Sequence, residues 1–163
     1  NTYMKRLLNK FSSAKGFTLI ELLIVIVIIS ALAIAVFVAL NPGQRVKDAN
    51  NARRTADVDT ILTAIHTSIV DTDGTMPAGI TTTEKQIGTA VTGCIIATGT
   101  CSVIAAADCI DLATVIPAYL KTNPIDPVGG TAALTAYTVV RDANNIVTVK
   151  ACSAQGTTIT VSR

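Results

Sequence analysis

The feature that most constrains this sequence is an apolar stretch of twenty-four residues that runs from Phe17 to Leu40. Only Thr18, Glu21 and Ser30 carry polar side chains within it. A helix of that length spans roughly 36 Å at about 1.5 Å per residue, which is enough to cross the hydrocarbon of a bilayer. A lone carboxylate in such a span costs on the order of 2.5–3.5 kcal/mol on insertion scales, so we expect Glu21 to have a partner.

The segment before this stretch is basic, with no acidic residue among the first sixteen. Its charged residues are Lys5, Arg6, Lys10 and Lys15. Positive charge at this place predicts a cytoplasmic N-terminus and export of the remainder of the chain. An ordinary secretory signal would also have basic and apolar regions, with Ala31-Leu32-Ala33 or Ala33-Ile34-Ala35 as its cleavage site. The apolar stretch is longer than the usual 7–15 residues of such a signal, and Glu21 would hinder it.

The string KGFTLIELLIVIVIIS, from Lys15 to Ser30, resembles the class III signal of bacterial type IV pilins and pseudopilins. The resemblance implies that a prepilin peptidase of the membrane cuts after Gly16 and methylates Phe17. It further implies a homo-oligomeric helical filament, in which Glu21 of one subunit pairs with the α-amino group of Phe17 in a neighbour. The partners would be the pilus assembly machinery and other copies of the chain. The location would be the inner membrane before assembly and an extracellular pilus afterwards.

Two alternatives remain open beside a pilus subunit. The first is a pseudopilin of type II secretion, which belongs to the same family. The second is of another class, an uncleaved single-pass anchor that displays a small binding domain. Translation would start at Met4 or before Asn1, and neither choice affects these alternatives.

Charge and composition exclude other classes of function. The whole chain has a formal net charge of +2, but four of its thirteen basic residues and none of its eleven acidic residues lie in residues 1–16. Residues 17–163 therefore sum to nine minus eleven, or −2, which predicts no nucleic-acid surface. One histidine, His66, and scattered acids make no catalytic constellation, so we expect no enzyme.

The interruption Asn41-Pro42-Gly43 divides the apolar stretch from an amphipathic one, because proline breaks or kinks a helix. We expect a leader at 1–16, a transmembrane and polymerisation helix at 17–40, a second helical half with its turn at 41–77, and a globular head at 78–163. Apolar residues recur at helical spacing in the second half; they are Val46, Ala49, Ala56, Ile61, Leu62, Ile65 and Ile69. The predicted solvent face contains Arg45, Lys47, Asp48, Arg53, Arg54, Asp57 and Asp59, with Arg53 and Asp57 placed to pair.

The head is predicted to end in a small antiparallel sheet. Residues 78–108 are rich in Thr, Gly and Ala, which favours a loop region, and a short helix is expected from Asp111 to Ile116. Alternating apolar residues predict strands at 137–141, 146–151 and 158–161, separated by turns. Three or four such strands packed on the amphipathic helix make the fold class α+β, the arrangement of the pilin fold.

The four cysteines, Cys94, Cys101, Cys109 and Cys152, point to disulfides, because an exported chain without a C-x-x-C spacing does not suggest zinc. Three pairings are possible. We favour Cys94–Cys101 across a hairpin that turns at Thr98-Gly99, together with Cys109–Cys152, which would resemble the C-terminal disulfide of many pilins.

The segment from Tyr119 to Gly130, YLKTNPIDPVGG, has a resemblance of its own, to the segment before the sheet in major pseudopilins. In several pseudopilins a nearby loop binds calcium, which makes Asp126 a candidate ligand here, with Asp142 further along the chain. Calcium takes six to eight oxygen ligands, and no acidic cluster surrounds Asp126 in the sequence. A Pro-Gly turn in which Asp126 bonds to local backbone is therefore favoured, and no other cofactor or metal is expected.

Overall fold

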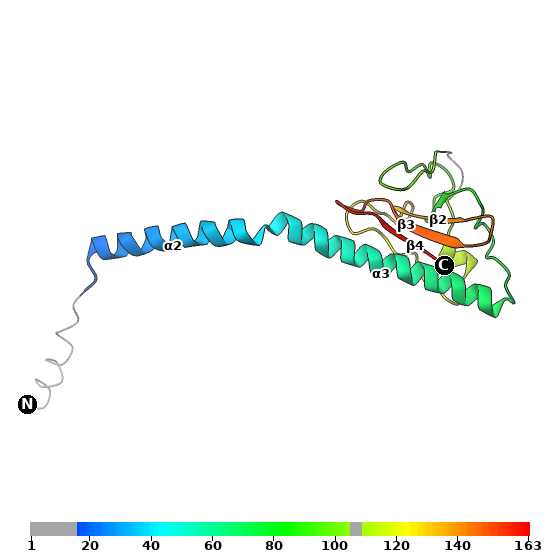
Figure 1. The fold of residues 1–163 in the computed structure, drawn as a ribbon, viewed down its shortest axis with the longest axis horizontal. Helices are drawn as coiled ribbons and strands as arrows, with labels where there is room; N and C mark the ends of the chain where they lie inside the picture. The colour runs from blue at the N-terminus through cyan, green and yellow to red at the C-terminus, as the bar shows by residue number, and fades with distance from the viewer. Residues whose placement is uncertain (1–15, 105–108) are drawn as a thin grey trace, which may run out of the picture. The chain divides into compact units, whose positions relative to one another are not determined.

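The structure, a computed structural model, describes residues 16–104 and 109–163. The chain divides into two compact units, Asn1–Pro42 and Gly43–Arg163. Long helices occupy the N-terminal half and a small antiparallel sheet lies near the C-terminus, which confirms the α+β class (Figure 1). The predicted leader, apart from Gly16, lies outside the described residues.

Helix α2 covers Leu19–Leu40 and contains no buried residue. It ends at Asn41, which adopts the left-handed conformation with φ 41°. Helix α3, Pro42–Asp71, begins with proline at its first position. Proline is well tolerated there, since the first N–H groups of a helix have no intrahelical acceptor. The interruption predicted at Asn41-Pro42-Gly43 therefore takes the form of one helix end followed directly by a second helix start.

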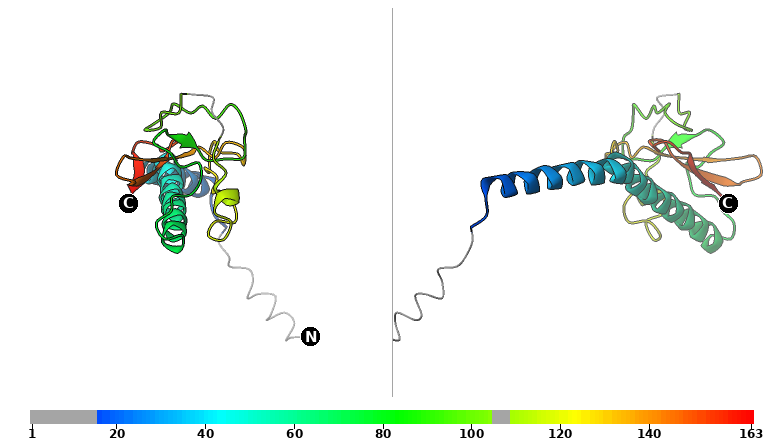
Figure 2. Two further views of the ribbon diagram at one scale, coloured as in Figure 1. Left: turned by 90° about the vertical axis from the view of Figure 1, so that its right-hand side faces the viewer. Right: turned by 60° about the vertical axis from the view of Figure 1, so that its left-hand side comes forward.

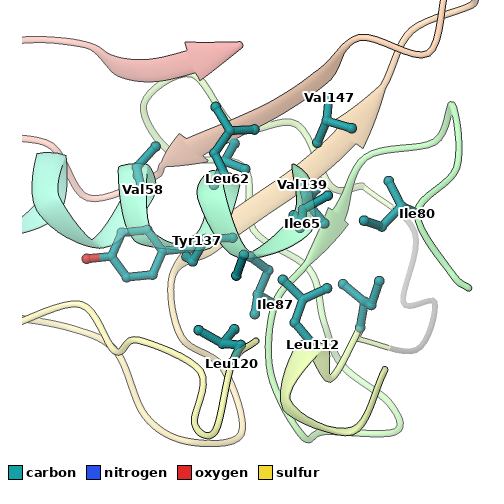
Figure 3. Packing of buried hydrophobic residues seen from close by; sticks show 14 of the residues in the cluster. Val58, Leu62, Ile65, Ile80, Ile87, Leu112, Leu120, Tyr137, Val139 and Val147 are labelled. Carbon is teal, nitrogen blue, oxygen red and sulfur yellow. The ribbon is translucent and has the colours of Figure 1, made fainter. Parts of the chain in front are cut away.

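Helix α3 buries one face in the head. Its largest buried aliphatic residues, Val58, Ile61, Leu62 and Ile65, are at most 1 % exposed. They belong to the same core as residues of the sheet, and Figure 3 shows Val58, Leu62 and Ile65 against Val139 and Val147. The helix ends at Asp71, and a turn with positive φ at Asp73 and Gly74 follows, as the sequence predicts.

The sheet has four antiparallel strands in the order β1-β2-β3-β4. Their bounds are Lys85–Gln86, Tyr137–Arg141, Val147–Ala151 and Ile159–Ser162. In the register, Val139 of β2 lies opposite Val149 of β3, and Val149 lies opposite Val161 of β4. The pleat therefore places one apolar row on the side of the core, and Figure 2 shows α3 running along the sheet. Strand β1 lies within residues 78–108, where the sequence predicted a loop region. It was not predicted, because two residues are too few to give an alternation signal.

The remaining core residues come from the connections. Ile80, Ile87 and Ile110 are almost fully buried, as are Leu112 and Leu120. Helix α4, Leu112–Val115, forms where the short helix is predicted, and the side chain of its N-cap Asp111 accepts a hydrogen bond from Ala113 N. These connections therefore contribute to the same core as α3 and the sheet.

The predicted cysteine pairing is wrong. The structure joins Cys94 to Cys109 and Cys101 to Cys152, each with Cα atoms 5.4 Å apart. The expected hairpin is present, with a bridge between Ile96 and Val103 and a hydrogen bond from Cys101 N to Thr98 O. In that register Cys101 lies opposite Thr98, so Cys94 and Cys101 are not cross-strand neighbours.

Candidate membrane and assembly site

The bond between Gly16 and Phe17 lies in exposed, non-helical backbone just before α2. A Cβ atom built on Gly16 would meet nothing within 4 Å. The fold of this chain therefore does not itself require glycine at that position. Any requirement for a small residue there would come from an enzyme that acts on the bond.

Thr18 and Glu21 form a capping box at the start of α2. Glu21 N donates to Thr18 Oγ1, and Thr18 N donates to Glu21 Oε2, each at 3.2 Å. Two backbone donors that the helix leaves without partners are thus satisfied, and the carboxylate lies at the positive end of the helix dipole. Sequence reasoning missed this role of Thr18, although Thr-x-x-Glu before an apolar run is its usual signal. The box supplies Glu21 with a partner inside its own chain.

The remainder of α2 presents apolar side chains on every side. All its residues are exposed, and the hydroxyl of Ser30 is satisfied by Ile26 O at 2.6 Å. A helix that is apolar all round needs lipid or other protein around it. Within the described part of the chain, the helical segment that begins at Leu19 is the one candidate membrane span by length and composition.

The comparison with protein families agrees with this geometry. Residues 11–37 match the family model described as a prokaryotic N-terminal methylation motif. That span contains Gly16, Phe17, Thr18 and Glu21 and most of α2. This match supports the resemblance to type IV pilins and pseudopilins. Comparisons with curated proteins and with solved structures found no match. Type IV pilins and pseudopilins are structural rather than enzymatic, and a membrane-anchored precursor fits both the motif and α2.

In the head, Asp126 has partners that the sequence did not suggest. Its carboxylate accepts hydrogen bonds from Arg54 Nε at 2.6 Å and Arg54 Nη2 at 3.0 Å. It also accepts from Val128 N at 2.9 Å and Gly129 N at 3.2 Å, which is the favoured backbone turn. A calcium ion would have to displace the guanidinium group. Among the described residues, no three of the types His, Cys, Asp and Glu gather as a metal site.

The solvent-facing position predicted for Arg54 is wrong, because its side chain is fully buried. The helical spacing contained the signal, since Arg54, Val58, Ile61 and Ile65 follow one another at intervals of four, three and four. An arginine on that stripe is easily assigned to solvent, because arginine is almost never buried without a partner. The predicted contact of Arg53 with Asp57 is present at 3.8 Å, on the exposed side.

The other candidate ligand, Asp142, bonds within its own turn. Its Oδ1 accepts from Asn144 N and Ile146 N, both at 2.8 Å, in the turn predicted between β2 and β3. Sequence reasoning also missed a polar cluster in the head. There Glu84 accepts from Thr138 Oγ1 at 2.6 Å and from Lys150 Nζ at 2.9 Å. No spacing in the sequence brings these residues together, since they come from three different segments.

Proposed function

We propose that this chain is a structural subunit of a type IV pilus filament. It enters the inner membrane as a prepilin, is cleaved after Gly16, is methylated at Phe17, and assembles helically through α2. The observation that carries this proposal is the coincidence of the methylation motif with a helix that has apolar side chains on every side and no buried residue. Such a helix is stable first in lipid and then against the same helix of neighbouring subunits.

The position of Glu21 supports assembly through its charge. Cleavage would create a new α-amino group at Phe17, four residues before Glu21 in the same chain. Pairing that amine with Glu21 of a neighbouring subunit would turn an isolated charge in an apolar setting into a neutralised pair. The capping box leaves this possible, because it uses only one carboxylate oxygen of Glu21, Oε2.

The first test identifies the N-terminal residue of the protein purified from its membrane or filament. We expect mass spectrometry to find a chain that starts at N-methylated Phe17. A Gly16→Leu variant should accumulate uncleaved, with its head folded as in the wild type, because Gly16 contacts nothing in the fold. Retention of residues Lys5 to Gly16 in the wild-type protein would instead support the uncleaved anchor.

The second test separates the charge of Glu21 from its capping role. Glu21→Ala removes both, whereas Glu21→Gln keeps an oxygen acceptor for Thr18 N and removes the charge. We expect both variants to be cleaved normally and both to lose most filaments in electron micrographs. Asp59→Ala, a change of an exposed acid on α3, is the matched control and should assemble. If Glu21→Gln makes abundant filaments, the capping box and not the charge pair is the function of Glu21.

A secretion pseudopilin is the near alternative within the family, and the segment from Tyr119 to Gly130 favours it. The two disulfides of the head suit both alternatives, since disulfides persist in the oxidising periplasm as well as outside the cell. Imaging of filaments from cells that express the chain at its natural level separates the two. Long, abundant surface filaments support the pilus. The pseudopilin is supported if such filaments are absent and the cells need the chain for normal secretion.

A further inference from the structure

The ion pair between Arg54 and Asp126 is the most deeply buried pair of charges in the described part of the unit Gly43–Arg163. Both side chains have an exposed fraction of 0 %. The pair joins α3 to the loop that contains Asp126, seventy-two residues further along the chain. An unpaired charge at this depth would cost several kcal/mol, so each group depends on the other.

The loop is folded tightly around the carboxylate. Asp126 N donates to Thr135 O at 3.0 Å, while the carboxylate accepts from the two backbone N–H groups that follow it. Gly130 closes the loop so closely that a Cβ atom there would lie 2.6 Å from Asp126 N and 2.7 Å from Thr135 O. The loop thus directs the negative charge of the Asp126 carboxylate toward a single position. The guanidinium group of Arg54 occupies that position and donates two parallel hydrogen bonds to the carboxylate.

The same guanidinium reaches a third segment through Asn51. Arg54 Nη1 donates to Asn51 Oδ1 at 2.9 Å, and this oxygen also accepts from Gln155 N at 3.1 Å. Asn51 Nδ2 donates to Gln155 O at 2.8 Å. One cation therefore connects α3, the loop of Asp126 and the connection between β3 and β4.

We propose that the guanidinium group of Arg54, which belongs to α3, takes the place of a bound cation at the loop formed by residues 123–130. The docking of this loop therefore does not depend on any bound ion. The Asp126 carboxylate and Asn51 Oδ1 accept the side-chain hydrogen bonds of Arg54, and together they define a site for a planar fork of donors. A free guanidinium ion fits such a site, whereas a compact ammonium group matches it poorly. Removal of the Arg54 side chain should therefore leave a head that binds guanidinium.

The test uses the full-length mature chain in detergent micelles, with the melting temperature of the head read from near-ultraviolet circular dichroism. We expect Arg54→Ala to lower the melting temperature by about 10–20 °C, the range for one broken buried pair in a domain of this size. Low-millimolar guanidinium should recover about half of that loss by binding the folded state, and ammonium should recover none. The neighbouring exposed variant Arg53→Ala should melt like the wild type and respond to neither ion.

Wild-type protein should melt at the same temperature with a chelator and with added calcium. A chelator that lowers this temperature, or calcium that rescues Arg54→Ala better than guanidinium does, would overturn the proposal. A folded Arg54→Ala chain without any loss would overturn it as well. If Arg54→Ala does not fold, the double variant Arg54→Met with Asp126→Leu tests the proposal instead. Folding of this pair, which keeps apolar volume and leaves no buried charge, supports the proposal; failure to fold overturns it, because the fold then depends on more than the pairing of these two charges.

Discussion

Tyr137 shows what a single polar atom requires in this core. Its side chain is fully buried, and Figure 3 shows the hydroxyl group pointing away from the aliphatic cluster. The hydroxyl donates to Asp57 Oδ2 at 2.8 Å. Burial, and then the hydrogen bond to Asp57, raise the pKa of Tyr137 far above its usual range. The neutral phenol is thus the form that the folded head requires.

This residue predicts how stability depends on alkaline pH. The folded pKa of Tyr137 lies above the unfolded value of about 10, so its contribution is complete below pH 10 and is lost as the pH rises further. We expect the urea midpoint of the head to fall between about pH 10 and 11 in the wild type. Tyr137→Phe should show a smaller fall and should be less stable by about 1 kcal/mol at pH 7.

The matched control for Tyr137 is Tyr119→Phe. Tyr119 is half-buried, but its hydroxyl donates to Asp71 at 2.7 Å in a solvent-exposed hydrogen bond, and this hydrogen bond raises its pKa too. Water can replace that partner, so Tyr119→Phe should leave the stability at pH 7 nearly unchanged. An equal loss of stability at pH 7 in both variants would show that the buried hydrogen bond of Tyr137 stabilises the fold no more than the exposed one of Tyr119.

At the scale of elements, the two disulfides fasten the segment between β1 and α4. Cys94–Cys109 spans fifteen residues within that segment, and Cys101–Cys152 spans fifty-one and ties it to the end of β3. Thr138 of β2 lies beneath the second disulfide, with its hydroxyl 3.3 Å from Cys101 Sγ. At Thr138, the outer face of the sheet is therefore covered by a covalently held loop rather than by a second layer of secondary structure.

The disulfides should contribute unequally. In the chain-entropy model, closing fifteen residues stabilises by about 3 kcal/mol and closing fifty-one by about 4 kcal/mol. We expect the double variant Cys101→Ser with Cys152→Ser to unfold at lower urea concentration than Cys94→Ser with Cys109→Ser. Equilibrium urea unfolding under oxidising conditions measures the difference. The reverse order would indicate that the disulfide Cys94–Cys109 stabilises the fold through contacts of its loop as well as through the entropy of loop closure.

At the scale of the whole molecule, the chain consists of two units that need different surroundings. The first contains α2, which has no buried residue and depends on lipid or protein around it. The second has its own core, in which α3, the sheet and the connections bury one continuous apolar cluster. A unit with its own core can fold independently of α2, and this division suits the filament subunit proposed above.

Much of this organisation could be predicted from local signals. The membrane-length stretch, the end of α2 at Asn41, the cap at Asp111 and the strand of Val147 each depend on neighbours in the sequence. The burial of Arg54 was missed although its spacing was visible, because its partner Asp126 lies in a distant loop. The cysteine pairing was missed because the register of a hairpin decides which residues oppose one another.

The sequence alone therefore determined the membrane-length helix, the N-terminal methylation motif and the α+β class, since length, hydropathy and periodicity are properties of continuous segments. Only the tertiary structure decided which cysteines pair, which cation meets Asp126 and which carboxylate meets Tyr137. Each of these contacts joins segments that are far apart in the chain. Their geometry depends on how α3 and the sheet pack, and that packing selects one partner among several with suitable chemistry.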